Sequence, residues 1–163
     1  MADATLIAHH QMNSPNTLTN SAGAAFYNSN LVDPGGSAAP TFLATGGVSG
    51  SGAYQFDGVD DNFGFAAVPG YTFIQANNLD WTVSFWIKAT DTTVNLSYAG
   101  TPQLPVLGNN SGSIGFGLGV DGGKAAYRRY SGSWQAASGV ATVADGIGHF
   151  VTFVAIGSSN LNI

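Results

Sequence analysis

Every second residue of "DWTVSFWIKAT", residues 80–90, is apolar from Trp81 to Ala89, and all but one of the residues between them are polar. Because successive side chains of an extended chain point to opposite faces, this pattern predicts a β-strand that is buried on one side. The buried face would carry four apolar residues, Trp81, Val83, Phe85 and Ile87. The opposite face would carry Thr82, Ser84, Trp86 and Lys88.

Period-two patterns recur along the chain, and no stretch shows a convincing helical stripe. Further strands are expected in "ATLIAHH", "AYQFDG", "NFGFAAV", "SWQAAS", "HFVTFVAIG" and "LNI". A hairpin is expected over 113–120 and 124–130, joined through Asp121-Gly122-Gly123. Residues 13–52 are rich in Asn, Ser, Gly and Pro, so we expect a long structured loop with one or two short strands. Many short strands with Gly-rich turns predict an all-β fold, an antiparallel two-sheet sandwich.

Composition limits the classes of function. The chain has 163 residues, which fits one domain, so we expect a single domain over 1–163. Charged residues make up only 8%, and the net charge is −5. A general nucleic-acid binder needs many cations, so that partner is not expected. There is no cysteine, no basic region that would begin a secretory signal, and no apolar run that could span a membrane.

The order of motifs resembles that of the laminin-G-like, concanavalin A-like jelly-roll family. The resemblance rests on "TLIAHH", "YQFDGVDDNF", "WTVSFWIKAT", "GFGLGVDGGKAAY" and "DGIGHFVTFVA", which cover nearly the whole chain in the family's order. It implies a jelly roll. Two positions depart from the family's "WHH" pattern, Gly148 and Phe150, so that strand is expected to pack differently. The family's closing strands are not found before the sequence ends at Ile163. Segment 13–52 or another chain could supply them, the chain could be truncated, or a sheet edge stays open to a partner.

Three aspartates, Asp57, Asp60 and Asp61, lie within five positions beside a predicted strand. Carboxylate oxygens are the ligands that calcium prefers, and members of the resembling family often hold calcium near this strand. Neighbouring strand residues point to opposite faces, so at most two of the three could face one ion. The alternative is a turn in which Asp57 caps the backbone and the others are solvated. Both interpretations stay open.

"YRRYSGSW" brings together aromatic rings and planar donors, which are the groups that bind sugars or protein partners: Tyr127, Arg128, Arg129, Tyr130 and Trp134. Alternation places Arg128 with Tyr130 on one face and Tyr127 with Arg129 on the other. The alternative is that one tyrosine belongs to the core and the arginines lie on a solvated or subunit-contacting face. Trp81 and Trp86 are both expected in the core.

Catalysis is not expected. The chain has no glutamate, and its aspartates lie at turns or next to each other, which does not suit glycoside hydrolysis. The three histidines, His9, His10 and His149, lie at strand starts, and no serine has the context of a nucleophile. We therefore expect a binding or structural protein, located on a virion surface or outside the cell. One placement is an oligomeric capsid decoration or tail-fibre protein, which contacts other virion chains. The other is a glycan-binding or adhesion module of a secreted bacterial protein.

Overall fold

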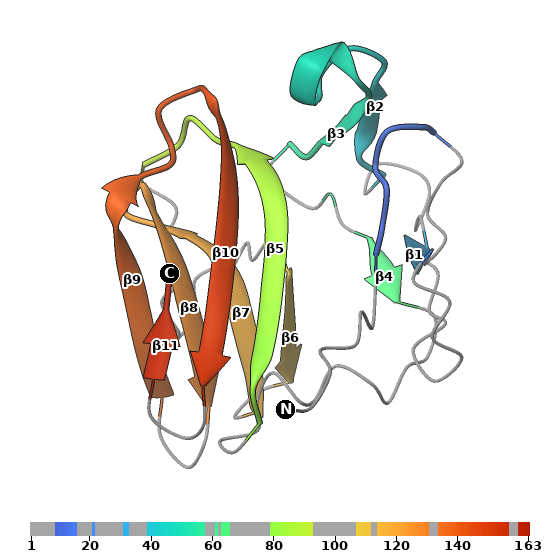
Figure 1. Cartoon of the computed structure of the whole chain (residues 1–163). Helices are drawn as coiled ribbons and strands as arrows, with labels where there is room; N and C mark the ends of the chain where they lie inside the picture. Colours follow the sequence, from blue (N-terminus) through green and yellow to red (C-terminus); the bar gives the residue numbers. More distant parts are fainter. Residues whose placement is uncertain are drawn as a thin grey trace, which may run out of the picture. The chain divides into compact units, whose positions relative to one another are not determined.

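A computed structural model gives the architecture of the chain (Figure 1). It describes residues 9–15, 21, 31–32, 39–57, 61, 63–65, 79–92, 107–111, 114–130, 134–156 and 160–163. Strands dominate these residues, and the helical content among them is one three-residue 3-10 turn, Val48–Gly50. The prediction of an all-β protein is confirmed. The jelly-roll topology stays a prediction.

The chain forms two compact units, Met1–Tyr71 and Thr72–Ile163. The expectation of a single domain over 1–163 stays a prediction. Among the described residues, no helix has the length and apolar character needed to cross a lipid bilayer.

The first unit contains two small antiparallel pairs. Strand β1 (Leu31–Val32) pairs with β4 (Gly64–Phe65), and β2 (Thr41–Leu43) pairs with β3 (Ala53–Gln55). The expected strands "AYQFDG" and "NFGFAAV" are therefore present in shortened form as β3 and β4. The strand expected in "ATLIAHH" lies almost wholly outside the described residues.

Aromatic side chains pack these short strands together. The ring of Tyr54 lies 5.3 Å from that of Phe42 and 4.8 Å from that of Phe63, both edge to face. Edge-to-face pairs place the positive edge of one ring on the negative face of another, which stabilises a small core that few other apolar groups fill. These ring contacts join β2 and β3 to Phe63, which immediately precedes β4.

The second unit contains two larger antiparallel sheets. One has the order β11-β10-β5, from β5 (Trp81–Lys88), β10 (Gly148–Ile156) and β11 (Asn160–Asn162). The other has the order β6-β7-β8-β9, from β6 (Leu107–Ser111), β7 (Ile114–Asp121), β8 (Lys124–Tyr130) and β9 (Trp134–Thr142). Figure 1 shows the first sheet lying across the second, so this unit is sandwich-like.

The core lies between these two sheets. Trp81 of β5 contacts Tyr127 of β8 at a ring distance of 5.5 Å, which joins the layers. Phe153 of β10 and Leu118 of β7 are both fully buried. Alternate residues of β5 are more buried than their neighbours, as the sequence pattern predicts. The expected strands at 80–90, 113–120, 124–130 and 149–157 are confirmed, and β9 extends the one expected in "SWQAAS".

The β7–β8 hairpin turns through Gly122 and Gly123, whose φ angles are +57° and +81°. Two consecutive residues with positive φ are the requirement of the tight turn whose twist matches paired strands. The carbonyl oxygen of Gly123 also accepts hydrogen bonds from the backbone N–H groups of Val143 and Ala144, at 2.8 and 3.2 Å. The turn therefore also fixes the end of β9.

Replacing Gly123 by alanine should destabilise the fold by about 1–2 kcal/mol, because a side chain at positive φ is strained. The added Cβ would also lie 3.2 Å from Cγ2 of Thr92. The measurement is urea unfolding of the wild type and the variant. Gly148→Ala is the matched control, since its φ is ordinary and nothing lies within 4 Å of its Cβ position. Equal losses in both variants would contradict this explanation of the turn.

Candidate functional site

Two aromatic rings stand exposed on the outer face of the β5–β10 pair. Trp86 is 55% exposed and Phe150 is 57% exposed. The two residues lie directly opposite each other in the antiparallel register, and their ring centroids are 5.3 Å apart with planes tilted by 48°. Large exposed rings that touch each other are unusual on a solvated surface, and they mark this face as a candidate binding surface.

Small and polar groups surround the two rings. Lys88 and Gly148 form the next pair on one side, and nothing lies within 4 Å of the position where a Cβ of Gly148 would be. Ser84 and Thr152 form the next pair on the other side, and their hydroxyl oxygens are 3.0 Å apart. We call these six residues the outer patch: Ser84, Trp86, Lys88, Gly148, Phe150 and Thr152. The patch combines two aromatic rings, the open space beside Gly148, one cation and two hydroxyls.

The prediction that both Trp81 and Trp86 belong to the core is half wrong. Trp81 is buried, with 6% of its surface exposed, whereas Trp86 faces outward. The reason is the alternation of β5 itself, which places Trp86 on the same side as Ser84 and Lys88. The two departures from the resembling family's pattern, Gly148 and Phe150, both lie in the outer patch.

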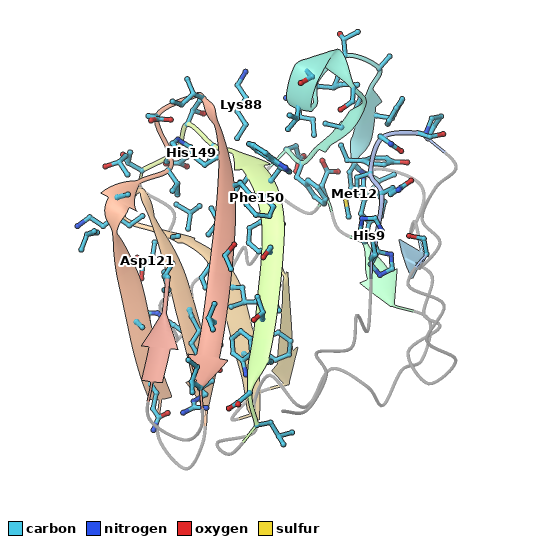
Figure 2. The ribbon with its side chains drawn as sticks, in the orientation of Figure 1. His9, Met12, Lys88, Asp121, His149 and Phe150 are labelled. Carbon is cyan, nitrogen blue, oxygen red and sulfur yellow. The ribbon has the colours of Figure 1, made fainter. Side chains whose placement is uncertain are left out.

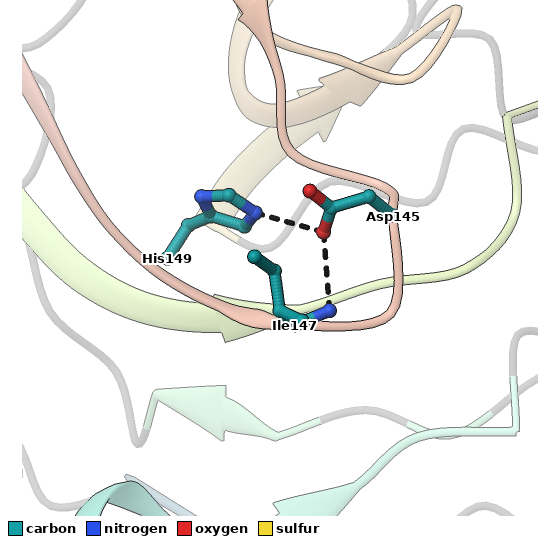
Figure 3. A network of polar contacts seen from close by, with 3 residues as sticks. All are labelled: Asp145, Ile147 and His149. Carbon is teal, nitrogen blue, oxygen red and sulfur yellow. Dashed lines mark hydrogen bonds and ion pairs between the residues drawn. The ribbon is translucent and has the colours of Figure 1, made fainter.

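A polar turn precedes β10 and holds the start of that strand (Figure 3). The Oδ1 atom of Asp145 accepts a hydrogen bond from the backbone N–H of Ile147 at 3.1 Å and lies 2.9 Å from Nε2 of His149. The hydrogen bond with His149, followed by that from Ile147, holds the pKa of Asp145 below its ordinary value. Because His149 lies between Gly148 and Phe150, this turn fixes the backbone beneath the outer patch.

Of the residues of "YRRYSGSW", the structure describes the side chains of Tyr127, Arg128 and Arg129, and the expectation of a contact site in this segment stays a prediction. Tyr127 is buried, with 3% of its surface exposed, and its ring lies against Trp81. Burial raises its pKa to about 12, although the neighbouring Arg129, which hydrogen-bonds it, acts in the opposite direction. Tyr127 is therefore a core tyrosine, the alternative that the sequence left open. The backbone of Tyr130 pairs with that of Trp134, and their side chains lie outside the described part of the structure.

The two arginines lie on opposite faces of β8. Arg129 donates from Nε to Oε1 of Gln135 at 2.8 Å, whereas Arg128 forms an ion pair of 2.7 Å with Asp121. Arg128 stands opposite Gly117, four residues along β7 from Asp121, which is about 13 Å of strand. To reach Asp121 its side chain must lie along the sheet, and Gly119 leaves room for it. This ion pair explains why some of the alternate positions of β7 are occupied by glycine.

Two members of the aspartate cluster, Asp57 and Asp61, contact each other. Oδ2 of Asp61 accepts a hydrogen bond of 2.6 Å from the backbone N–H of Asp57. Asp61 thus supplies an oxygen to the backbone of Asp57, while Asp60 lies outside the described residues. No group of three potential metal ligands is found in the part of the chain that the structure describes. Calcium binding stays a prediction.

Two of the histidines contact side chains within their own units. His9 contacts the hydroxyl of Ser21 through Nδ1 at 2.8 Å, within the first unit. His149 pairs with Asp145 in the second unit. No family model, curated protein or solved structure matches the chain. The outer patch therefore has to be interpreted from its own geometry.

The Asp145 turn should make the protein sensitive to acid. A lowered pKa in the folded state means that the ionised carboxylate stabilises the fold above the ordinary value of 3.8, and that this stabilisation is lost as the pH falls through the lowered pKa. Asp145→Asn should therefore lower the urea midpoint near neutral pH, and the difference from the wild type should disappear at low pH. A difference that does not change with pH would contradict this role.

Proposed function

We propose that the chain is a non-enzymatic binding protein that holds a carbohydrate against its outer patch, on a jelly-roll sandwich of the laminin-G-like kind. The observation that carries the proposal is the exposed pair Trp86–Phe150. Sugars present flat faces of C–H groups, which stack on aromatic rings, while nearby polar groups orient their hydroxyls. The hydroxyls of Ser84 and Thr152 lie beside the pair for this purpose.

The tilt between the rings indicates the size of the ligand. Because the planes of Trp86 and Phe150 differ by 48°, one pyranose ring can lie flat on only one of them. Two linked sugars can each use one ring, which doubles the apolar surface removed from water. The outer patch therefore fits an oligosaccharide better than a monosaccharide.

The interpretation as a binder rather than an enzyme is supported by the chemical groups present. The chain lacks glutamate and cysteine altogether. Around the outer patch, Asp145 already accepts hydrogen bonds from Ile147 and His149. Glycoside hydrolysis needs two carboxyl groups facing each other across the bond to be cleaved, and no such pair borders the patch among the described residues.

Replacing Trp86 by alanine should weaken binding of oligosaccharides about tenfold, since a stacked ring contributes on the order of 1 kcal/mol beyond its buried area. The fold should survive, because the side chain is already more than half exposed. The measurement is a glycan array to find ligands, followed by calorimetric titration of the best one.

The matched control for this experiment is Val140→Ala. Val140 is 93% exposed on β9, which belongs to the other sheet, so its removal should leave affinity unchanged. An affinity that is equal in the wild type and in Trp86→Ala would overturn the assignment of the outer patch as the binding surface.

A second candidate function, a structural component of a virion surface, is favoured by strand β9. This nine-residue strand ends the sheet order β6-β7-β8-β9, and it carries neither charge nor proline. Such an edge offers unpaired backbone groups to another chain, because charge and proline are the usual means of blocking it. The register between β8 and β9 is irregular near Ala126, which disturbs the regular pairing toward the end of β9. Pairing of β9 with another chain is therefore expected along Trp134–Ser138.

If β9 pairs with another copy, Ser138→Lys should reduce self-association, because a lysine on an edge strand disfavours further pairing. The measurement is the solution mass by light scattering, where the wild type should be a discrete oligomer and the variant should shift toward monomer. Thr45→Lys, in the exposed turn after β2, makes the same charge change elsewhere and should have no effect. A monomeric wild type would count against this candidate function.

A further inference from the structure

We infer that the outer patch selects saccharides that carry an anionic group, and that Lys88 is the residue that selects them. This inference rests on the proposed carbohydrate-binding function and adds the chemical class of the ligand. The observation behind it is that Lys88 lies beside two exposed rings, Trp86 and Phe150, and opposite Gly148, which has no side chain.

Lys88 lies at the end of β5, directly opposite Gly148 and two residues from Trp86. Side chains two residues apart share a face, so the lysine side chain stands next to the ring of Trp86. Figure 2 shows Lys88 projecting at the end of the sheet where His149 and Phe150 also lie. Nothing lies within 4 Å of the position where a Cβ of Gly148 would be, so the side of the sheet shared with Lys88 is open to a ligand group at this pair.

The charge of Lys88 is not neutralised by a neighbouring acid in the described part of the chain. The ion pairs found there join Arg128 to Asp121 and His149 to Asp145. Oδ1 of Asp145, on the adjacent turn, is directed to His149 and to the backbone of Ile147. A lysine ammonium without such a partner attracts an anion locally, and this attraction acts against the repulsion from the net charge of −5.

The ring pair limits what the anion can be attached to. A free inorganic anion would gain nothing from Trp86 and Phe150, whereas a sugar that carries a carboxylate or a sulfate would use both the rings and the lysine. The ammonium is a compact charge with three rotatable donors, so it recognises a carboxylate or a sulfate without a fixed geometry. The shared chemistry of the ligand is thus an oligosaccharide with an anionic substituent.

The experiment uses the intact chain and pairs of probes that differ only in charge. One pair is an oligogalacturonate and its methyl ester, and another is hyaluronan oligosaccharide and its methyl ester. A sulfated carrageenan oligosaccharide and its desulfated form distinguish sulfate from carboxylate. Calorimetric titration should give about three- to tenfold tighter binding of the charged member, as expected for one charge-assisted contact. This preference should weaken as salt is added.

Variants at position 88 separate the charge from the shape of the side chain. Lys88→Met keeps the length and should abolish the preference for the charged member while binding to the neutral member persists. Lys88→Arg should retain the preference. Equal binding of charged and neutral members by the wild type would overturn this inference and leave the proposed function standing. A panel in which neither member of any pair binds would overturn the proposed function itself.

Discussion

The antiparallel pairing of β5 with β10 is the constraint on which the rest of the second unit depends. Its register places Phe150 opposite Trp86 and Val151 opposite Phe85, so one alignment determines both faces of the sheet. Because side chains alternate with a period of two, a slip of one residue would move the core residues outside and the exposed rings inside. The packing of Phe85 against Phe153, at 5.7 Å, opposes such a slip. The strand register that the buried apolar residues stabilise therefore also positions the outer patch.

The ends of the strands are fixed by backbone geometry as well as by apolar packing. Gly123 supplies a positive φ and a carbonyl oxygen that binds the residues after β9. The backbone N–H of Gly146, in the turn held by Asp145, bonds the carbonyl oxygen of Ala89 just after β5. These contacts lie at the same end of the sandwich as Lys88 and Gly148, and they define the backbone from which the outer patch projects. A rigid scaffold of this kind lowers the entropic cost of ordering a site when a ligand binds.

The strands with clear alternation could be predicted from the sequence, whereas the site could not. The apolar face of β5 can be identified from the sequence. The same alternation also predicts that Trp86 is exposed, if position along the strand is given more weight than its aromatic character. In β10 both faces carry apolar residues, so the exposure of Phe150 becomes clear only from the pairing with β5. Strand β6 was not predicted, because "LGNNS" has the composition of a turn and forms a strand only through its neighbour β7.

The most direct test of the account is nuclear magnetic resonance of the labelled chain during titration with an oligosaccharide that the glycan array identifies. Each tryptophan indole N–H gives its own signal, so the responses of Trp81, Trp86 and Trp134 can be separated. The account predicts that the indole signal of Trp86 and the amide signals of Gly148 and Phe150 shift together, while that of the buried Trp81 stays in place. Saturable binding that shifts the signals of the "YRRY" segment or of Asp57 and Asp61, and leaves that of Trp86 unchanged, would contradict it.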